Sequence, residues 1–457
     1  MNDDLTSKSA TELIQLISAR EVSSVEIVEA HLQRIEQLNP ALNAIVTIAP
    51  DVVAQARAKD EQLARGQVSG ALHGLPVTIK DTIDTEGIRT TYGSRVFARH
   101  VPAQDSPVVA RLKAGGALIL GKTNTPEMAI PYETDNLLFG RTNNPHDLSR
   151  TCGGSSGGEA AALAAMLSPA GIGSDLSGSI RVPAHFCGVT GLKPTTGIFP
   201  MDGHVPRAVG ALALGATVGP MARYVDDLSL LFRTMAGKSQ TGDFKDERGR
   251  VAWFVDDGVS PVAEDIVRAV QLAADALQDA GFEVRQEMPA AFSEGQRLWI
   301  ELFAGAAAEE IGRLYLGHEQ EAGPLVSPVL QRANQTTREA KIQTAEALAK
   351  AVLERERYRE ELLHWMRTTP LIIAPVSATT AFEHGATRVT VREKSISVFR
   401  ACSYSQAVNV FGLPAVALPV ARTGRGLPIG VQIIGRPFQE ELVMTAARFI
   451  ERAVGFW

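Results

Sequence analysis

Residues 152–195 read CGGSSGGEAAALAAMLSPAGIGSDLSGSIRVPAHFCGVTGLKPT, and this stretch decides the fold. It places Ser155 and Ser179 in two glycine-rich turns, which are separated by an alanine-rich helix and a short apolar strand. Upstream, GLPVTIKD (74–81) predicts another strand, which ends on Lys80. A lysine and two serines at the ends of such elements form a nucleophile-and-base set, which indicates hydrolysis of an amide.

Helices and apolar strands alternate on either side of this stretch. GGALILGKTN (115–124) repeats the order helix, strand and polar turn. PAVALPVA (414–421) and IGVQIIG (429–435) are typical of two central strands joined by a tight turn. The alternation predicts an α/β protein with a mostly parallel sheet. Near the N-terminus, Ser23 and Glu26 form a capping box, and the helix that follows is expected to end at Pro40.

Composition excludes several classes of protein. The chain has 457 residues, 45% hydrophobic and 21% charged, with a net charge of −6, which argues against a nucleic-acid partner. The longest apolar run is broken by Ser168 and Pro169 and is too short to span a membrane. The N-terminus has no apolar signal segment. Three cysteines (Cys152, Cys187 and Cys402) are too few for a disulfide framework, so we expect a cytoplasmic protein.

The GGSSGG segment has three readings. Its composition is that of a flexible linker. It could also bind a phosphate at the start of the following helix, but the lysine and hydroxyl residue of a P-loop are missing. Third, it matches the G-x-S-x-G nucleophile elbow, which requires a strand before the serine. The preceding residues, HDLSRTC (146–152), form a poor strand, so we reject an α/β-hydrolase.

Ser179 has the better context for a nucleophile, because an apolar strand runs directly into its turn. Successive N–H groups of such a turn can form an anion-binding nest, which suits the oxyanion of a tetrahedral intermediate. A structural turn capped by hydroxyl groups explains the segment equally well. No nearby histidine (His146, His185 or His204) sits in a triad pattern. A neutral Lys80 could instead take a proton from Ser155, which takes one from Ser179.

These segments together resemble the amidase signature family. Its members typically carry GGSSGGS and GTDTGGSIRIPA-type blocks at the same spacing, and the match covers about residues 70–235 and resumes at 409–420 and 426–438. The stretches GSDLSGSIR and GPMARYVDDL are closer to the fatty-acid-amide hydrolase branch than to others. The resemblance implies an amidase that acts on a small carboxamide or N-substituted amide, with no metal and no organic cofactor.

The resemblance also assigns roles to individual residues. Ser179 matches the nucleophile, Ser155 the bridging serine that a cis peptide often precedes, and Lys80 the base. Asp175 and Arg181 match a supporting pair. The backbone N–H groups of four residues match the oxyanion hole: Leu176, Ser177, Gly178 and Ser179.

Three departures from the family pattern limit what the resemblance says about substrate. Ser177 stands where glycine is usual, so its side chain narrows the acyl site or contacts the substrate. Cys152 stands where proline is common, and we interpret it as a small filler. Residues 240–370 match no known pattern. The identity of the amide therefore stays open. Two alternative functions also stay open: the glutamine-hydrolysing A-type subunit of a tRNA-dependent amidotransferase, and a non-catalytic scaffold with the same fold.

The resemblance implies one compact α/β/α domain over 1–457, with helices on both faces of a mixed, mostly parallel, twisted sheet. Within it we expect an N-terminal helical wrapper at 1–66, the catalytic core at 70–235, a substrate-shaping region at 240–370, and core strands with a helix at 371–457. For the oligomeric state of the protein, the form that we consider is a homodimer.

Overall fold

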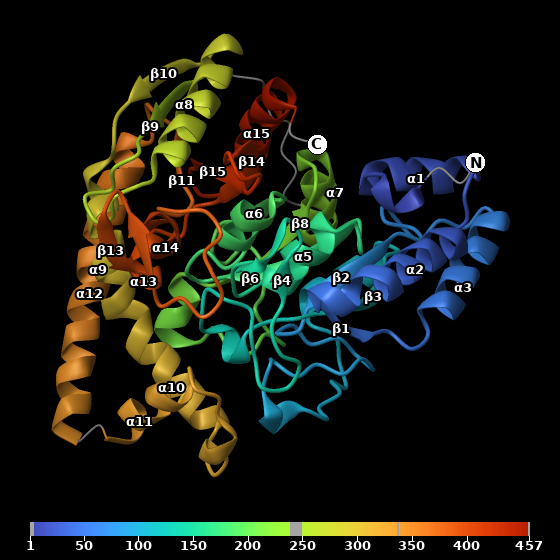
Figure 1. The fold of residues 1–457 in the computed structure, drawn as a ribbon, viewed down its shortest axis with the longest axis horizontal. Helices are drawn as coiled ribbons and strands as arrows, with labels where there is room; N and C mark the ends of the chain where they lie inside the picture. The colour runs from blue at the N-terminus through green and yellow to red at the C-terminus, as the bar shows by residue number, and fades with distance from the viewer. Residues whose placement is uncertain (1–3, 238–248, 336–337, 456–457) are drawn as a thin grey trace.

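The computed structural model describes residues 4–237, 249–335 and 338–455. They form a single α/β domain around a mixed sheet of 11 strands (Figure 1). In their order across the sheet, the strands are β1 (Ile45–Ile48), β3 (Leu118–Thr123), β2 (Pro76–Lys80), β6 (Ala170–Asp175), β8 (Thr217–Ala222), β7 (Thr190–Lys193), β14 (Ala415–Arg422), β15 (Pro428–Gly435), β11 (Leu371–Pro375), β9 (Arg250–Trp253) and β10 (Glu283–Gln286).

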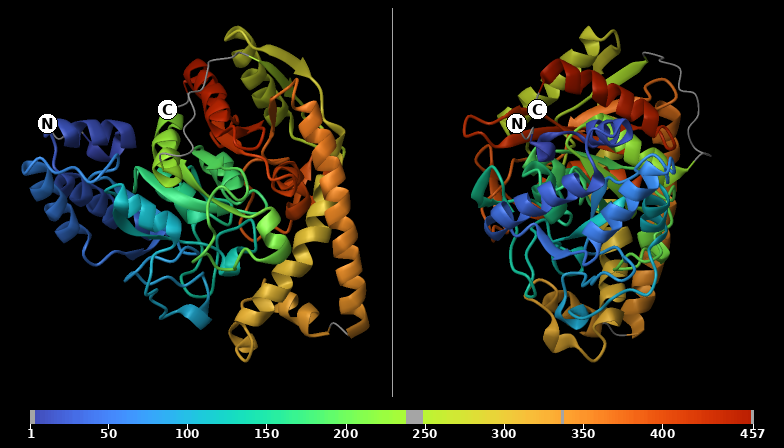
Figure 2. Two further views of the ribbon diagram at one scale, coloured as in Figure 1. Left: turned by 180° about the vertical axis from the view of Figure 1, so that it is seen from behind. Right: turned by 90° about the vertical axis from the view of Figure 1, so that its right-hand side faces the viewer.

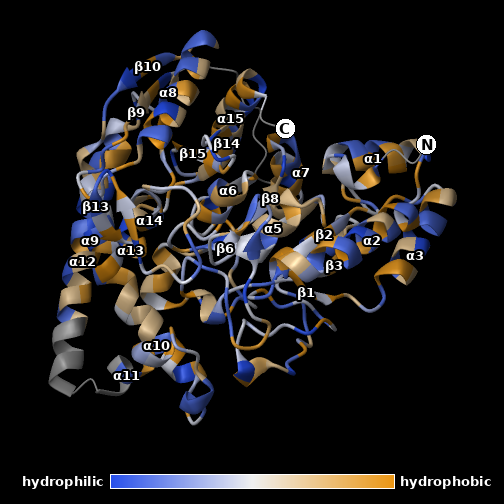
Figure 3. Cartoon of the chain, viewed as in Figure 1, coloured by the Kyte–Doolittle hydropathy of each residue, from blue (hydrophilic) through white to orange (hydrophobic). Residues whose placement is uncertain are grey.

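Helices cover both faces of this sheet, as the two views of Figure 2 show. One face packs against α5 (Gly157–Ala164), α6 (Arg181–Cys187) and α14 (Ser403–Val410). The other packs against α7 (Val225–Ala236), α8 (Glu264–Asp279) and α15 (Glu440–Val454), and α4 (Pro107–Ala114) packs on α7. Along these outer helices, Figure 3 shows apolar residues alternating with polar ones. The reason is that each helix buries one side and exposes the other.

The mixed α/β sheet is confirmed, but it is not mostly parallel. The parallel pairings lie toward the two edges, where β2 joins β3 and β6 and where β9 joins β11 and β10. The middle is antiparallel from β6 through β8, β7, β14 and β15 to β11. Part of the reason is the predicted turn between β14 and β15, which makes these long strands a hairpin rather than a helix-linked pair.

The N-terminal segment carries α1 (Ala10–Ala19), α2 (Ser24–Leu42) and α3 (Val52–Ala64), together with strand β1, which the sequence did not predict. The capping box of Ser23 and Glu26 is confirmed. The expectation that α2 ends at Pro40 is wrong, because the helix continues to Leu42. Asn39 makes this continuation favourable: its carbonyl accepts from Asn43 N at 2.6 Å, and its side chain binds the chain just beyond.

Residues 295–335 and 338–365 form a helical arm that projects from the sheet (Figures 1 and 2). It consists of α9 (Gly295–Trp299), a π-helical turn (Ile300–Ala304), α10 (Gly305–Leu314), α11 (Ser327–Gln335) and α12 (Arg338–Trp365). A small second apolar cluster packs the end of α10 against the loops that carry Tyr92 and Met128. The arm contributes Ile311 and Tyr315 to this cluster. The predicted region 240–370 thus supplies both this arm and the sheet strands β9 and β10, while its residues 240–248 lie outside the described residues.

Across the described residues, no helix combines the length and the apolar character needed to cross a membrane.

Candidate active site

The three predicted catalytic residues lie at the ends of neighbouring elements. Strands β2 and β6 are paired in parallel, so Lys80 at the end of β2 and Asp175 at the end of β6 reach the same edge of the sheet. Helix α5 packs on both strands and begins at Gly157, immediately after the GGSS turn. The loop that carries Ser179 follows β6 directly. The fold therefore brings one lysine and two serine-bearing turns to one place.

Lys80 is fully buried, and its amine contacts two hydroxyl groups. Its Nζ lies 2.6 Å from Ser155 Oγ and 3.0 Å from Ser174 Oγ. Burial lowers the pKa of Lys80 to about 7, although the charges of Asp175 and Glu159 act in the opposite direction. A substantial share of this amine is therefore neutral near pH 7, which is the state that can accept a proton from a serine.

Ser155 is hydrogen-bonded to the chain just after β3. The peptide bond between Gly154 and Ser155 is cis, and the Ser155 carbonyl accepts a hydrogen bond from Thr125 Oγ1 at 3.0 Å. A Cβ at Gly154 would lie 2.6 Å from a backbone oxygen, so only glycine fits there. The preceding residues do form a short strand, β5 (Asp147–Thr151), contrary to the sequence-based expectation. That strand belongs to a separate two-stranded ribbon, so no nucleophile elbow is formed.

Ser179 lies beside this pair, and the residue is buried, with 9% of its surface exposed. Its carbonyl accepts a hydrogen bond from Ser156 N at 3.0 Å, which ties the two serine-bearing turns together. Within the described residues, Ser179 Oγ has no hydrogen-bond partner. The structure therefore joins Lys80 to Ser155 directly, and it brings Ser179 to the same turns with its hydroxyl group available.

The turn at Leu176–Ser179 presents unpaired N–H groups. The N–H groups of Leu176, Ser177 and Ser179 make no hydrogen bond to any described residue. The Gly178 N–H differs, because it donates to Asp175 Oδ1 at 2.8 Å. Three of the four predicted oxyanion donors are therefore free to bind a ligand, while the fourth shapes the turn.

A buried ion pair holds this turn in place. Arg181 and Asp175 are both fully buried, with Nη2 3.0 Å from Oδ1 and Nε 3.1 Å from Oδ2. Burial alone would raise the pKa of Asp175, but the Arg181 guanidinium, together with Lys193 and the hydrogen bond from Asn409, holds this pKa below its usual value. Arg181 also donates to Gln432 on β15 and to Asn409 on α14, so hydrogen bonds link the ion pair to the sheet and to that helix. The predicted supporting pair therefore holds the turn in position, because Asp175 accepts hydrogen bonds from the N–H groups of Gly178 and Ile180.

The sequence analysis did not identify the groups that clamp the other side of the turn. The Tyr132 hydroxyl donates to the Ser177 carbonyl at 2.8 Å and also contacts Ser177 Oγ. Gln406 Nε2 donates to Tyr132 Oη at 3.1 Å, and Trp299 Nε1 donates to the Leu176 carbonyl at 2.8 Å. The Ser177 side chain is thus bound by the protein itself. No local pattern signals these contacts, since the partners come from distant loops and helices.

Three aromatic rings stand together beside the same turn. The ring centroid of Phe399, on the short helix α13 (Val398–Ala401), lies 5.1 Å from that of Trp299 and 6.4 Å from that of Tyr132. The three residues Tyr132, Trp299 and Phe399 are called the aromatic wall below. Two of the three, Tyr132 and Trp299, are hydrogen-bonded to the turn itself, at Ser177 and Leu176.

Cys152 is fully buried, and burial raises the pKa of its thiol to about 12. Such a thiol is not a nucleophile near neutral pH, which agrees with its interpretation as a filler. The described parts of the chain contain no group of three or more His, Cys, Asp or Glu side chains placed to hold a metal ion.

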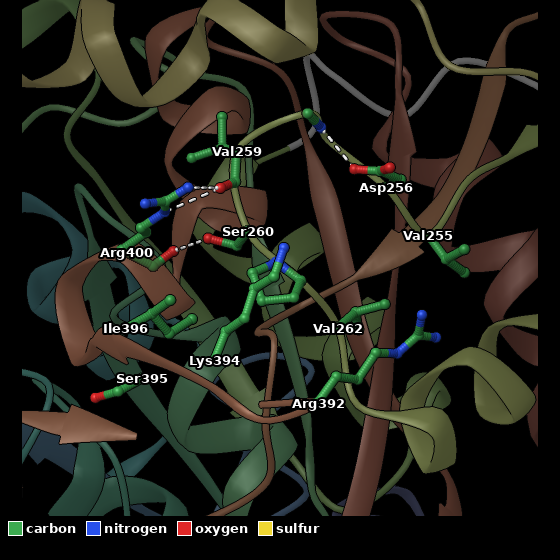
Figure 4. Close-up of a pocket in the computed structure, with 12 residues that line it drawn as sticks. Val255, Asp256, Val259, Ser260, Val262, Arg392, Lys394, Ser395, Ile396 and Arg400 are labelled. Carbon is green, nitrogen blue, oxygen red and sulfur yellow. Dashed lines mark hydrogen bonds between the residues drawn. The ribbon is translucent and has the colours of Figure 1, made fainter. Parts of the chain in front are cut away.

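A separate pocket of about 870 Å³ opens between the loop after β9 and the hairpin of β12 (Arg388–Val391) and β13 (Lys394–Ser397). Figure 4 shows Lys394 near its centre, with Arg392 and Arg400 to either side. None of the predicted catalytic residues lines this pocket.

Comparisons with known proteins identify the family of this chain. The profile of the family described as Amidase matches residues 26–444. The chain is 33% identical to the A-type subunit of the glutamyl-tRNA(Gln) amidotransferase of Methylococcus capsulatus (strain ATCC 33009 / NCIMB 11132 / Bath), over 98% of this chain and 97% of the relative. It is 30% identical to the fatty-acid amide hydrolase 2 of Homo sapiens, over 98% of this chain and 89% of the relative.

Solved structures are similar over the whole chain. A crystal structure of an amidase superposes with a TM-score of 0.87 at 27% identity and covers 98% of this chain and 100% of its own. The 6-aminohexanoate cyclic dimer hydrolase, solved with its substrate, gives 0.85 at 29% identity and covers 99% of this chain and 98% of its own. A bacterial aryl acylamidase gives 0.86 at 25% identity, with 98% and 96% coverage.

Proposed function

The chain belongs to the amidase family and is an amidohydrolase, and on that premise we propose that it cleaves a carboxamide or N-substituted amide through an acyl-enzyme on Ser179. The products are a carboxylic acid and ammonia or an amine. The buried contact of 2.6 Å between Lys80 Nζ and Ser155 Oγ carries this proposal. It supports the proposal because burial lowers the pKa of this amine to about 7, and a neutral amine could accept a proton from Ser155.

The reaction begins with attack of Ser179 Oγ on the amide carbonyl carbon. As the C–O bond forms, the Ser179 proton passes to Ser155 Oγ while the Ser155 proton passes to neutral Lys80. The negative charge moves to the carbonyl oxygen, where the free N–H groups of Leu176, Ser177 and Ser179 stabilise it.

Collapse of the tetrahedral intermediate breaks the C–N bond. The Lys80 ammonium returns its proton through Ser155 to the departing nitrogen, which leaves as ammonia or an amine. A water molecule then attacks the Ser179 ester while its proton passes through Ser155 to Lys80. The bond between the acyl carbon and Ser179 Oγ breaks, Ser179 regains a proton from Lys80 through Ser155, and the carboxylic acid is released. Both half-reactions use the same groups, so each turnover restores the starting protonation states.

We propose that the acyl group is uncharged and is aliphatic or aryl. The aromatic wall adjoins the Ser179 turn, and the nearby charged pair of Asp175 and Arg181 is buried and self-neutralised. A substrate with free ammonium and carboxylate groups would need charged partners in such a site. The wall and the paired charges therefore support a simple amide over an amino-acid amide.

A second candidate is the glutamine-hydrolysing A-type subunit of a tRNA-dependent amidotransferase. The 33% identity to such a subunit over nearly the full length favours it. In that case the protein would act with partner subunits. A non-catalytic scaffold is less well supported, because Lys80, Ser155 and Ser179 are all present and the Lys80 amine contacts Ser155 Oγ.

The test is to assay the purified chain alone with aliphatic amides, anilides and glutamine, and to measure release of ammonia or amine. We expect turnover of the uncharged amides and little with glutamine. Turnover of glutamine alone, or only after a partner subunit is added, would favour the second candidate. Absence of turnover with every amide, together with no reaction of Ser179 with an activated phosphonate, would reject catalysis.

Ser177→Gly is expected to change which acyl groups are accepted, since it removes the hydroxyl group that contacts Tyr132. The hydrogen bond from Tyr132 to the residue 177 carbonyl remains, so the turn should keep its shape. We expect a change of about tenfold in the relative kcat/KM of small and bulky acyl groups, within the range that small changes in a pocket produce. The measurement compares kcat/KM for acetyl, butyryl and benzoyl anilides. Identical profiles for the two proteins would show that Ser177 does not affect acyl selection.

A further inference from the structure

Trp299, the last residue of α9, donates a hydrogen bond to the turn that follows β6. Its Nε1 lies 2.8 Å from the carbonyl oxygen of Leu176. The peptide bond between Leu176 and Ser177 is trans, so its C=O and N–H bonds point in opposite directions. The Ser177 N–H makes no hydrogen bond to any described residue. This free donor therefore points away from the indole that holds the other end of its peptide group.

The other two free donors of the turn are anchored in the same way, through the carbonyl of their own peptide group. Asn409 Nδ2, on α14, donates to the Asp175 carbonyl at 3.3 Å. Val182 N, on α6, donates to the Gly178 carbonyl at 2.7 Å. A hydrogen bond to the carbonyl also polarises a peptide group, which makes its N–H a stronger donor. Of these three donors, it is that of Ser177 which the helical arm anchors.

The fourth N–H group of the turn shows the contrast. Tyr132 Oη donates to the Ser177 carbonyl at 2.8 Å. The N–H of the same peptide group, which belongs to Gly178, donates to Asp175 Oδ1 at 2.8 Å. This peptide group is held at both ends and offers no donor to a ligand. Tyr132 therefore shapes the turn, whereas Trp299 holds a peptide group whose donor is free.

Packing on two sides keeps the indole of Trp299 in place. Its ring centroid lies 5.8 Å from that of Phe303 and 5.1 Å from that of Phe399, and both contacts are edge-to-face. Helix α9 can approach α14 closely because Gly295 has no side chain: a Cβ there would lie 2.3 Å from Ala407 Cβ. The helical arm is thus packed against the core through the helix that carries the indole.

We propose that Trp299 is a positioning residue for the oxyanion site, because its indole N–H orients the peptide group that presents the Ser177 N–H. The inference rests on the proposed function, since it assumes that the free N–H groups of this turn stabilise the tetrahedral intermediate. The Leu176 carbonyl accepts no other hydrogen bond from a described residue. Without the indole N–H this peptide group can rotate, and its donor is no longer preorganised for the developing charge. The helical arm thereby contributes to the rate of the reaction.

The experiment measures how a fluorophosphonate labels Ser179 in the wild type and in Trp299→Phe. As Ser179 Oγ attacks phosphorus and fluoride leaves, negative charge develops on the phosphoryl oxygen, which takes the place of the amide oxygen. Phenylalanine keeps an aromatic ring but donates no hydrogen bond. We expect the maximal labelling rate to fall about tenfold, less than the roughly 10²- to 10³-fold loss when an oxyanion donor is removed outright. The probe concentration that gives half the maximal rate should stay the same.

A merely structural role of Trp299 would give a different result. A loosened site would raise the half-saturating probe concentration or lower the melting temperature, while the maximal rate would stay that of the wild type. That outcome would overturn the inference and leave the proposed function intact. A wild type that the probe never labels would overturn both.

Trp365→Phe is the matched control, because it removes another indole hydrogen bond of the same arm. Trp365 is the last residue of α12, and its Nε1 donates to Glu287 Oε1 at 2.9 Å, next to the edge strand β10. Its labelling kinetics should match those of the wild type. An equal fall in the maximal rate of this variant would show that the effect belongs to the arm as a whole, which would count against a specific role for Trp299.

Benzothienylalanine at position 299 keeps the test decisive if Trp299→Phe does not fold, or if both of its labelling constants change. This amino acid keeps the two fused rings of tryptophan and has a sulfur atom where the indole has its N–H. The maximal labelling rate should again fall about tenfold, as expected for a misaligned oxyanion donor, with the melting temperature of the wild type. A wild-type labelling rate with this residue would contradict the proposal.

Discussion

Ser179→Ala is expected to reduce kcat/KM for amide hydrolysis by about four orders of magnitude or more, the scale seen when a serine nucleophile is removed. The reason is that no neighbouring group can replace it. Ser155 Oγ is engaged with Lys80, and Cys152 is fully buried with a raised thiol pKa. The variant should fold normally, since Ser179 Oγ makes no hydrogen bond to any described residue.

The measurement is the intact mass after treatment with a fluorophosphonate, beside the rate of amide hydrolysis. The wild type should gain one adduct and Ser179→Ala none. Ser177→Ala is the matched control, because it alters a serine of the same turn that lies outside the relay, and it should still be labelled. An adduct on Ser179→Ala, or residual activity within tenfold of the wild type, would assign the nucleophile to another residue.

The sequence predicted the elements that carry the site because these are local. The GGSSGG turn, the strand before Asp175 and the strand ending on Lys80 each follow from short patterns of glycine and apolar residues. The resemblance to a family then supplied the roles of Lys80, Ser155 and Ser179. The observed contact between Lys80 and Ser155 agrees with those roles, but the roles themselves remain predictions.

What the sequence could not predict depends on long-range packing. Tyr132 and Trp299 reach the Ser179 turn from segments far away in the chain, so no local pattern shows that they clamp it. The hydrogen bond from Gly178 N–H to Asp175 depends on the orientation of the Asp175 side chain, which a sequence pattern does not show. The antiparallel centre of the sheet was missed because alternation of helix and strand indicates parallel pairing only where a helix connects adjacent strands.

Glu159 illustrates a different limit. In the sequence it is one polar residue in an alanine-rich helix, which would ordinarily be solvated. The structure buries it because Gly171 leaves space and two threonines supply hydrogen bonds. Each of these three residues is unremarkable where it stands in the chain. Their shared site exists only after β2, β3 and β6 have been brought side by side.

Lys80→Met is expected to lower kcat/KM by about 10²- to 10⁴-fold, the range for loss of a general base. Methionine keeps most of the volume of the buried stem and removes the amine. The wild-type rate should rise with pH through about 7, because protonated Lys80 cannot accept the Ser155 proton. The residual rate of Lys80→Met should lose this rise near pH 7, since the group that produces it is gone. The measurement is kcat/KM between pH 5 and 9 for both proteins.

Thermal unfolding separates this loss from misfolding. Burial lowers the native pKa of Lys80, so the unfolded chain binds the proton more tightly, and its protonation opposes folding below the unfolded pKa. Replacement of the amine by an apolar group of similar size should therefore leave the melting temperature near pH 7 unchanged or higher. A stable Lys80→Met protein that keeps full activity and the same pH profile would refute the relay. A stable variant with little activity and no rise near pH 7 would assign the base to Lys80.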